Sequence, residues 1–364
     1  MRKLLAIAAL AAFTTSTAAA QSRWTPEIGI QGGYNHMKPA GTGANDAINL
    51  ITIPGASFIT AVYGSGAFFA IIPAGQKLAI EPQFSFSQVE TGGSHATIAK
   101  LGLRADYALN ANVYGAVGGA LNYIEQGSTP SHTQLGAQVA VGYRKPLTSS
   151  LNARLEASVT TMKKSDLLGP LDAYQLLLGV SSSLRARPAA RARAAKSSWD
   201  PMIGVSGGYF AMHQVGGANV TGVAFPAFGG DGAMFGLTGA AMPSLFAIIP
   251  MGQKLALEPG VDFTNVSQSG SPSSSAISVS GRLDYAVKGN WYAAAGGVLN
   301  HVSGGGTSAS LTGLLVAWGY RFHLAGPFGG RFEVNYLQSG KNTDLGIGPT
   351  NTLGLAFGAM MPLK

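Results

Sequence analysis

Apolar and polar side chains alternate along most of this chain. In residues 77–90, for example, Leu78, Ile80 and Phe84 share one face, and polar side chains occupy the other. Because successive side chains of a strand point to opposite faces, this alternation predicts strands with one apolar face. Short turns, or stretches rich in Gly, Ser, Pro and Asn, separate the alternating segments. The first half of the chain is predicted to hold strands at residues 26–38, 56–73, 77–90, 96–109, 112–125, 132–147, 150–163 and 171–184.

The same pattern occurs a second time along the chain. Residues 69–82, which read FAIIPAGQKLAIEP, return as FAIIPMGQKLALEP at 246–259, at an offset of 246 − 69 = 177. Other matching segments keep the same order, so the sequence predicts two copies of one unit, at 24–184 and 199–364. Residues 185–198 hold five basic and no acidic residues. They are predicted to form a solvated Arg/Ala-rich linker.

Composition indicates that the apolar strand face lies against lipid. Hydrophobic residues make up 46% of the chain and charged residues only 11%, against about 25% in soluble proteins. A water-facing surface would need far more Lys, Glu and Asp, whereas small polar residues suit the interior of a narrow barrel. The absence of Cys excludes a disulfide framework and a cysteine metal site. No apolar run after the first 20 residues approaches the ~20 needed for a spanning helix.

Aromatic residues fall at predicted strand ends next to the short turns. A preference for strand ends at one level predicts an outward-facing girdle at the membrane interface. The predicted girdle consists of Trp24, Tyr107, Tyr143, Trp199, Tyr285, Trp291 and Tyr320.

The N-terminus has the features of an export signal. Residues 1–20 begin with Arg2 and Lys3, continue through an apolar stretch to Phe13 and end in a small-residue cleavage site at Ala20. Removal of this signal peptide leaves a net charge of 22 − 16 = +6. We therefore expect a protein of the bacterial outer membrane. Its expected partners are outer-membrane lipid and the outer-membrane assembly machinery, with no nucleic acid, and the sequence names no surface ligand.

Fourteen charged residues recur on the polar face at matching places of the two copies. An unpaired charge inside a narrow barrel would cost several kcal/mol, so these side chains are predicted to pair. We interpret them as a network that neutralises and fills the lumen. The alternative is a proton or ion path, or a gate opened by exchange of ion-pair partners. The predicted network consists of Lys77, Glu81, Arg104, Asp106, Arg144, Arg154 and Glu156, and of Lys254, Glu258, Arg282, Asp284, Arg321, Arg331 and Glu333.

Enzymatic chemistry is not predicted. None of the six His residues has a His at the matching position of the other copy, and no nucleophile motif accompanies any of them. His36, near the outer end of the first strand with hydroxyls around it, is the best candidate for a lipid-modifying site. No metal-ligand spacing, phosphate loop or dinucleotide fingerprint occurs. The sequence therefore predicts no catalytic residue, cofactor or metal.

Each copy resembles the small eight-stranded outer-membrane β-barrels of the OmpA/OmpX type. The resemblance rests on the opening strand with Gly32-Gly33-Tyr34, the strands that carry the charged residues, the segment 142–144 and the apolar closing strand. It implies an all-β protein that forms an antiparallel up-and-down transmembrane barrel.

Two architectures fit these observations. We expect two tandem eight-stranded barrels, because the linker is longer and more charged than the short periplasmic turns within such barrels. One sixteen-stranded barrel is the alternative. The expected function is that of an integral outer-membrane protein with a structural or surface-interaction role. A porin-like pore for small solutes is the alternative, and an outer-membrane lipid-modifying enzyme is a second alternative.

Overall fold

The computed structural model describes most of the chain between residues 24 and 363. The predicted signal peptide at 1–20, and residues 185–197 of the predicted linker, lie outside the described residues. Among the described residues, no helix is long and apolar enough to cross a bilayer. The described residues are 24–39, 47–53, 68–127, 130–148, 151–164, 170–184, 198–215, 217, 219–225, 245–268, 272–325, 328–342 and 348–363.

The first half of the chain, residues 24–184, forms nine of the described strands. Seven of the eight predicted segments correspond to one strand each. Of the predicted strand at 56–73, residues 68–73 form β3, and residues 56–67 lie outside the described residues. The strands are β1 (Glu27–Pro39), β2 (Ile48–Ile53), β3 (Phe68–Pro73), β4 (Leu78–Thr91), β5 (Ser94–Ala108), β6 (Val113–Gln126), β7 (His132–Pro146), β8 (Leu151–Met162) and β9 (Leu171–Ser183).

The second half, residues 199–364, forms the other nine described strands in the same order of lengths and turns. They are β10 (Met202–Gln214), β11 (Asn219–Phe225), β12 (Leu245–Pro250), β13 (Leu255–Gln268), β14 (Ser274–Lys288), β15 (Trp291–Gly304), β16 (Thr307–Ala325), β17 (Phe328–Ser339) and β18 (Thr350–Pro362).

The described strands close into one sixteen-stranded antiparallel barrel. The prediction of two tandem eight-stranded barrels is therefore wrong, and so is the resemblance to eight-stranded OmpA/OmpX-type barrels. The short strands β2 and β11 decide this. β2 pairs with β1 on one side and with β13 of the other half on the other, where Ile53 lies opposite Phe263. β11 pairs with β10 and with β4, where Val220 lies opposite Thr91.

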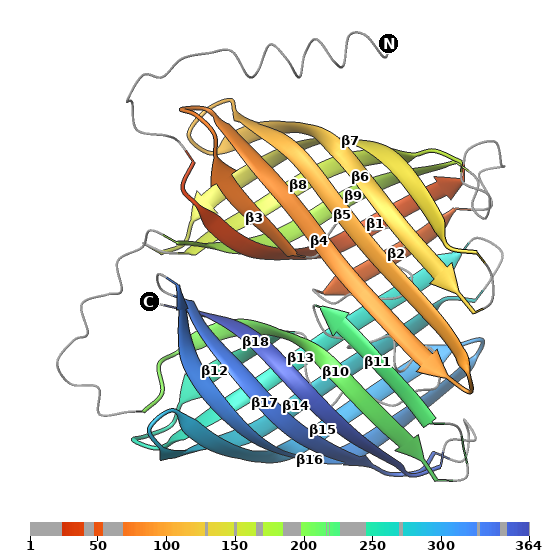
Figure 1. Cartoon of the computed structure of the whole chain (residues 1–364), viewed down its shortest axis with the longest axis vertical. Helices are drawn as coiled ribbons and strands as arrows, with labels where there is room; N and C mark the ends of the chain where they lie inside the picture. The colour runs from red at the N-terminus through yellow and green to blue at the C-terminus, as the bar shows by residue number, and fades with distance from the viewer. Residues whose placement is uncertain are drawn as a thin grey trace.

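The sixteen-stranded ring can be followed from strand to strand. It runs from β1 through β2 to β13, on through β18, then through β10 and β11 to β4, and through β9 back to β1. β2 and β11 thus exchange places between the halves. In Figure 1, β11 lies beside the outer part of β4, between the two halves.

The shorter strands β3 and β12 divide the end of the barrel that carries the short turns. β3 pairs with the first residues of β1 and with β4. β12 pairs in the same way with β10 and β13. The wide ring at the loop end therefore narrows into two lobes, one from each half of the chain (Figure 1).

An apolar seam joins the two lobes. Leu151 of β8 packs with Phe328 of β17 and Met361 of β18, and all three side chains are buried. Ile28 from the first half and Ile203 from the second pack against them. Because these side chains would face lipid if each half formed its own barrel, the seam adds apolar burial to the sixteen-stranded form.

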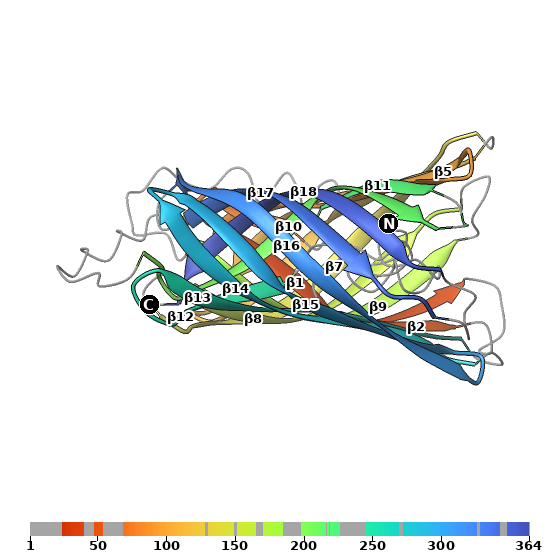
Figure 2. The same ribbon diagram turned by 90° about the horizontal axis from the view of Figure 1, so that it is seen from below.

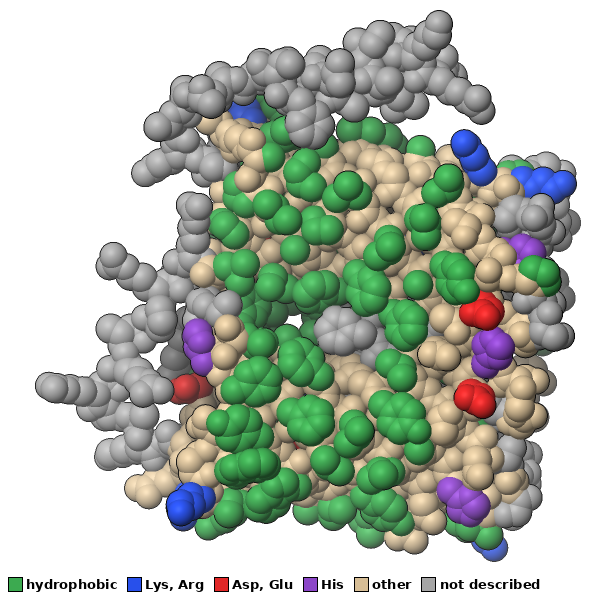
Figure 3. Space-filling model, viewed as in Figure 1, with side chains coloured by type: hydrophobic (Ala, Val, Ile, Leu, Met, Phe, Trp, Pro, Cys, Tyr) green, Lys and Arg blue, Asp and Glu red, His purple; other side chains and the backbone are tan. Residues whose placement is uncertain are grey.

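The outer wall of the barrel is apolar and the inner side is polar. On β5, Leu101 and Leu103 are 52% and 60% exposed, whereas the alternate residues Gly102 and Arg104 are buried. The strands cross this wall obliquely (Figure 2). Hydrophobic side chains cover the middle of the surface, and charged side chains gather towards its two ends (Figure 3). This is the expected exterior of a barrel that spans a bilayer.

The predicted aromatic girdle is only partly present. Trp24 and Trp199 are buried inside the lobes at 2% and 3% exposure, so their assignment to the outer surface is wrong. Each precedes the first strand of its half, and the chain turns inward there, which the alternation pattern does not reveal. The other predicted girdle residues are exposed on the outer wall: Tyr107, Tyr143, Tyr285, Trp291 and Tyr320.

Candidate functional site

A cluster of five charged side chains fills the lumen of the first lobe. The strand period of two places Arg104 and Asp106 on the inner face of β5, and Arg154 and Glu156 on the inner face of β8. Glu81 on β4 lies directly opposite Arg104 in the sheet register. All five side chains are at most 3% exposed. We call these residues the first-half cluster.

The ion pairs of the first-half cluster cross the lumen. Arg104 donates from Nη1 to Oε1 of Glu156 at 2.7 Å and from Nη2 to Oε2 at 2.6 Å, a bidentate pair between β5 and β8. Its Nε lies 2.9 Å from Oδ1 of Asp106. Arg154 donates from Nη1 to Oε2 of Glu81 at 2.7 Å and also pairs with Glu156. Charge-assisted bidentate bonds of this kind are the strong ones in proteins, so the cluster ties opposite walls of the lobe together.

The second lobe holds an equivalent cluster. Arg282 donates to the two carboxylate oxygens of Glu333 at 2.8 and 2.6 Å, and its Nε lies 3.0 Å from Oδ1 of Asp284. Glu258 lies opposite Arg282 in the register and pairs with Arg331. All five side chains are at most 3% exposed. We call these residues the second-half cluster.

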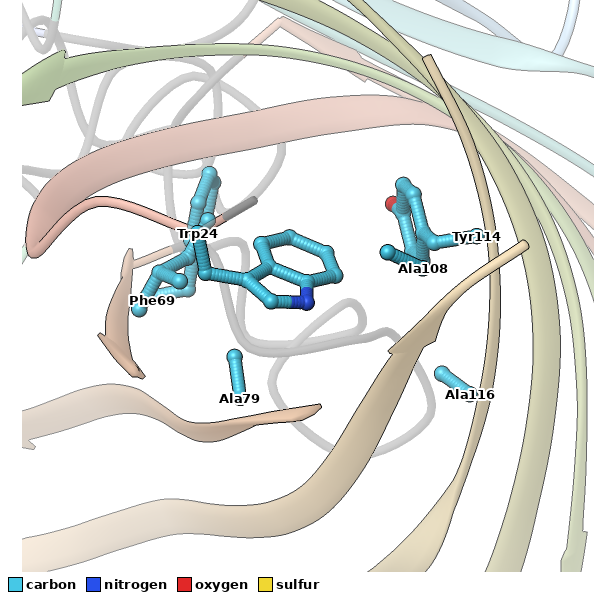
Figure 4. Close-up of a cluster of buried hydrophobic side chains, with 7 residues drawn as sticks. Trp24, Phe69, Ala79, Ala108, Tyr114 and Ala116 are labelled. Carbon is cyan, nitrogen blue, oxygen red and sulfur yellow. The ribbon is translucent and has the colours of Figure 1, made fainter. Parts of the chain in front are cut away.

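The rings of Trp24, Phe69 and Tyr114 lie inside the first lobe, together with small alanine side chains (Figure 4). The hydroxyl of Tyr114 donates to Oε2 of Glu156 at 2.6 Å. The ring of Trp24 packs edge-on against Tyr114, with 5.6 Å between centroids, and its Nε1 donates to the carbonyl of Lys77 at 2.9 Å. The guanidinium of Arg154 lies 4.5 Å from the centroid of Phe69. These contacts form a compact floor beneath the charges.

The floor recurs in the second lobe. Tyr292 donates to Glu333 at 2.7 Å, and Trp199 packs edge-on against Tyr292 with 5.6 Å between centroids. Arg331 lies 3.7 Å from the ring centroid of Phe246. Both lobes are thus filled by ion pairs above and aromatic side chains below.

Four of the predicted network residues lie outside the two clusters. Lys77 and Lys254 are exposed at the short turns, beside the outward rings of Tyr107 and Tyr285. They are the last residues before β4 and β13, so the inner-face assignment fails for them. The other two lie at the floor: Arg144 pairs with Glu27 and lies over Trp24 at 4.6 Å, and Arg321 lies over Trp199 at 3.9 Å and donates to the carbonyl of Ser198.

Sequence reasoning missed Glu27, Tyr114 and Tyr292 as lumen residues. The sequence did hold a signal for Tyr114 and Tyr292, in the glycine of the segment Gly-Tyr-Arg that occurs at 142–144 and again at 319–321. Gly142 lies opposite Tyr114, and a Cβ built on that glycine would lie 2.1 Å from the tyrosine ring. Gly319 stands in the same relation to Tyr292, with a distance of 2.3 Å. Each glycine therefore makes the space that an inward tyrosine requires.

The histidines lie away from the lumen clusters. His36 sits on the outer side of β1, where its Nδ1 lies 2.7 Å from Oδ1 of Asn49 on β2. His301 on β15 lies 2.8 Å from Oγ of Ser310 on β16. In the described part of the chain, no hydroxyl hydrogen-bonds to His36, and no group of three or more His, Asp or Glu side chains is placed to hold a metal.

Comparison with known proteins gives distant likenesses. No protein-family model matches the sequence, and no curated protein matches it closely. Among solved structures, it is similar to the CymD monoaromatic hydrocarbon channel, with 9% identity, a TM-score of 0.30, and coverage of 94% of this chain and 89% of that one. It is similar to the NanC porin, with 10% identity, a TM-score of 0.22, and coverage of 77% and 100%. An outer membrane channel from Pseudomonas putida F1 has 10% identity, a TM-score of 0.26, and coverage of 95% and 100%.

The closed barrel and its apolar outer surface indicate that the protein lies in a membrane. Every described strand pairs on both sides, so the barrel has no free edge, and its exposed middle is apolar. A closed barrel with an apolar exterior and a polar interior satisfies the backbone within a bilayer. The protein is an outer-membrane β-barrel with ion pairs buried in its interior.

Proposed function

We propose that this protein is a porin-like channel for small solutes whose short-turn end is closed by the two ion clusters and their aromatic floors. The observation that carries this proposal is the pairing of β2 with β13 and of β11 with β4. Barrel diameter grows with strand number: about eight strands leave room only for side chains, whereas sixteen leave room for an aqueous channel. A purely structural barrel has no need of the wider ring.

The inner wall towards the loop end supports a polar path. Asn35 on β1, Gln175 on β9 and Ser158 on β8 form a chain of hydrogen bonds on the inner face. All three are at most 4% exposed. Amide and hydroxyl groups of this kind can exchange their mutual hydrogen bonds for bonds to a polar solute or water.

The two floors are the part that must move for a solute to pass. Each lobe is narrow because β3 or β12 closes it, and its ion cluster and aromatic layer fill it. A switch of ion-pair partners, together with a rotation of the tryptophan ring, is the smallest change that opens a path. Conduction is therefore expected to be intermittent rather than constant.

Single-channel recording tests this proposal directly. Purified protein is placed in a planar lipid bilayer, and wild type is compared with W24A/W199A, which removes the ring that caps each floor. We expect brief openings in wild type and openings at least several times more frequent in W24A/W199A. The matched control is W291A/W318A, which removes two tryptophans that are 45% and 47% exposed on the outer wall. This control is expected to conduct like wild type.

The outcome that contradicts the channel is clear. If neither wild type nor W24A/W199A opens while both remain folded, the lumen is a permanent plug, and the protein has a structural or surface-interaction role instead.

We propose no enzymatic role for this barrel. An activated nucleophile needs a base within about 2.6–3.2 Å, and that base must in turn be oriented by a third group. Among the described residues, His36 contacts Asn49 but no hydroxyl, and His301 contacts Ser310 but no carboxylate or amide. Assays of lipid hydrolysis with wild type, H36A and S310A are expected to show no activity above background. Turnover in wild type that H36A or S310A abolishes would overturn this.

A further inference from the structure

One buried cation in the lumen belongs to neither ion cluster. Lys100 lies on the inner face of β5, four residues before Arg104, which is about 13 Å along the strand. Its side chain is 2% exposed. In the described part of the chain, no ion pair or hydrogen bond reaches Lys100. A buried ammonium without a partner costs several kcal/mol, so its presence calls for an explanation.

The neighbours of Lys100 across the sheet are polar. Ser85 on β4 lies directly opposite Lys100 on one side, and Asn122 on β6 lies opposite on the other. Both are buried on the inner face, at 3% and 0% exposure. The hydroxyl of Ser85 makes no hydrogen bond to any residue that the structure describes. Directly opposed Cβ atoms lie about 4.5–5.5 Å apart, so an unpaired hydroxyl donor stands beside the ammonium.

The second half lacks this arrangement, although it keeps the ion cluster. Ser278 stands at the place of Lys100, and Asp262 stands at the place of Ser85, each directly opposite the other in the register. Both are buried on the inner face. The two clusters consist of the same residue types, but at this level the first lobe carries a positive charge and the second a negative one. A filler for the barrel interior would not need this difference.

We propose that Lys100 and Ser85 form a binding subsite for a small oxyanion, a carboxylate or phosphate group, in the first-half lumen. The ammonium would supply the charge, and the Ser85 hydroxyl a hydrogen bond to a second oxygen of the ligand. This rests on the proposed channel function and names the class of solute that the first half selects.

Thermal unfolding of the purified full-length protein in detergent tests the subsite without any need for conduction. The midpoint is measured with sodium phosphate, sodium acetate or sodium chloride at equal ionic strength. Phosphate or acetate is expected to raise the midpoint of wild type above its value in chloride. K100Q is expected to weaken the apparent affinity about tenfold or more, which is the effect of losing one charge-assisted hydrogen bond. K100R, which keeps the charge, is expected to retain most of the shift.

Lys288→Gln is the matched control, because Lys288 is an exposed lysine at the end of β14. It is expected to respond to anions like wild type. K100Q itself should fold, since it removes an unpaired buried charge. A shift of the midpoint with phosphate alone would indicate a site for phosphate groups. A shift with both phosphate and acetate would indicate a site that also accepts carboxylates. No shift in wild type relative to chloride, or an equal shift in K100Q, would overturn the subsite.

Reversal potentials under a salt gradient separate this proposal from the channel itself. If the channel opens, K100Q is expected to lower the anion-to-cation permeability ratio about twofold or more, and K288Q is not. If no variant conducts while the anion-dependent midpoint shift of wild type is lost in K100Q, the channel function fails and the subsite stands. If wild type conducts but its unfolding midpoint does not depend on the anion, the channel function is supported and the subsite is refuted.

Discussion

Removal of Arg154 should expose how much the first-half cluster contributes to stability. The side chain is 2% exposed, donates to both oxygens of Glu81 at 2.7 and 3.2 Å, and also pairs with Glu156. The substitution R154Q leaves three buried carboxylates, those of Glu81, Asp106 and Glu156, with Arg104 as the remaining cation of the cluster.

The magnitude follows from the two lost ion pairs. Two unit charges 4 Å apart interact by about 4 kcal/mol at an effective dielectric of about 20. Much of that gain is offset by the desolvation of the arginine, which R154Q no longer has to bear. Removing one partner of a buried ion pair destabilises a protein by about 3–5 kcal/mol, so we expect R154Q to lower the free energy of unfolding by that amount.

Urea unfolding of the barrel in phospholipid bilayers, followed by tryptophan fluorescence, measures this difference. Trp24, one of four tryptophans, packs against Tyr114, which is bonded to the same cluster, so the signal includes the unfolding of this lobe. E125Q is the matched control, because Glu125 pairs with His95 at 3.3 Å but both side chains are more than a third exposed. Its effect is expected to be much smaller than that of R154Q, because solvent screens an exposed ion pair.

A second substitution checks the physical reason. In R154Q three buried carboxylates share Arg104, which still lies 3.0 Å from Glu81. Adding E81Q removes one of these three negative charges, so the double variant is expected to recover about 1–2 kcal/mol of the loss. A folded R154Q within about 1 kcal/mol of wild type would refute the reasoning. So would an E81Q substitution that adds to the loss instead of offsetting it.

Three further predictions follow from the packing, two for substitutions and one for the two halves of the chain expressed separately. G142A should lower the free energy of unfolding by about 1–3 kcal/mol, because its Cβ would lie 2.1 Å from the Tyr114 ring. G281A is the control in the same urea titration and should be close to neutral, because a Cβ at Gly281 meets nothing within 4 Å. F328A, at the apolar seam, should lower it by about 3–5 kcal/mol and F332A, which is 48% exposed, by clearly less; equal losses would argue against the seam. The two halves expressed as separate chains should copurify as one barrel, and a half that becomes protease-resistant in membranes on its own would contradict the strand exchange.

Much of the fold could be predicted from local pattern. The predicted segments at 132–147 and 171–184 match β7 (His132–Pro146) and β9 (Leu171–Ser183) closely. The inward position of Arg104 and Asp106 followed from their spacing of two on the polar face. Their burial made pairing a physical necessity.

The predictions failed at places where no local pattern acts. Lys77 precedes its strand by one residue, so the alternation no longer determines its direction. Trp24 lies before β1 and turns inward to cap the lobe. Lys100 sits on a face that alternation identifies correctly, but it has no charged counterpart in the second half, so a search for matching charges passed over it.

The sequence by itself determined which face of each strand meets lipid. Alternation with a period of two separates the two faces, and the low content of charged residues indicates that the apolar face is the outer one. It did not determine which strands would pair across the two halves. Backbone hydrogen bonds between strands carry little sequence information, and β4 and β13 have similar sequences, so β2 and β11 could join either one. Only the tertiary structure decided that they exchange, because the wide ring and the apolar seam form only when both halves are present.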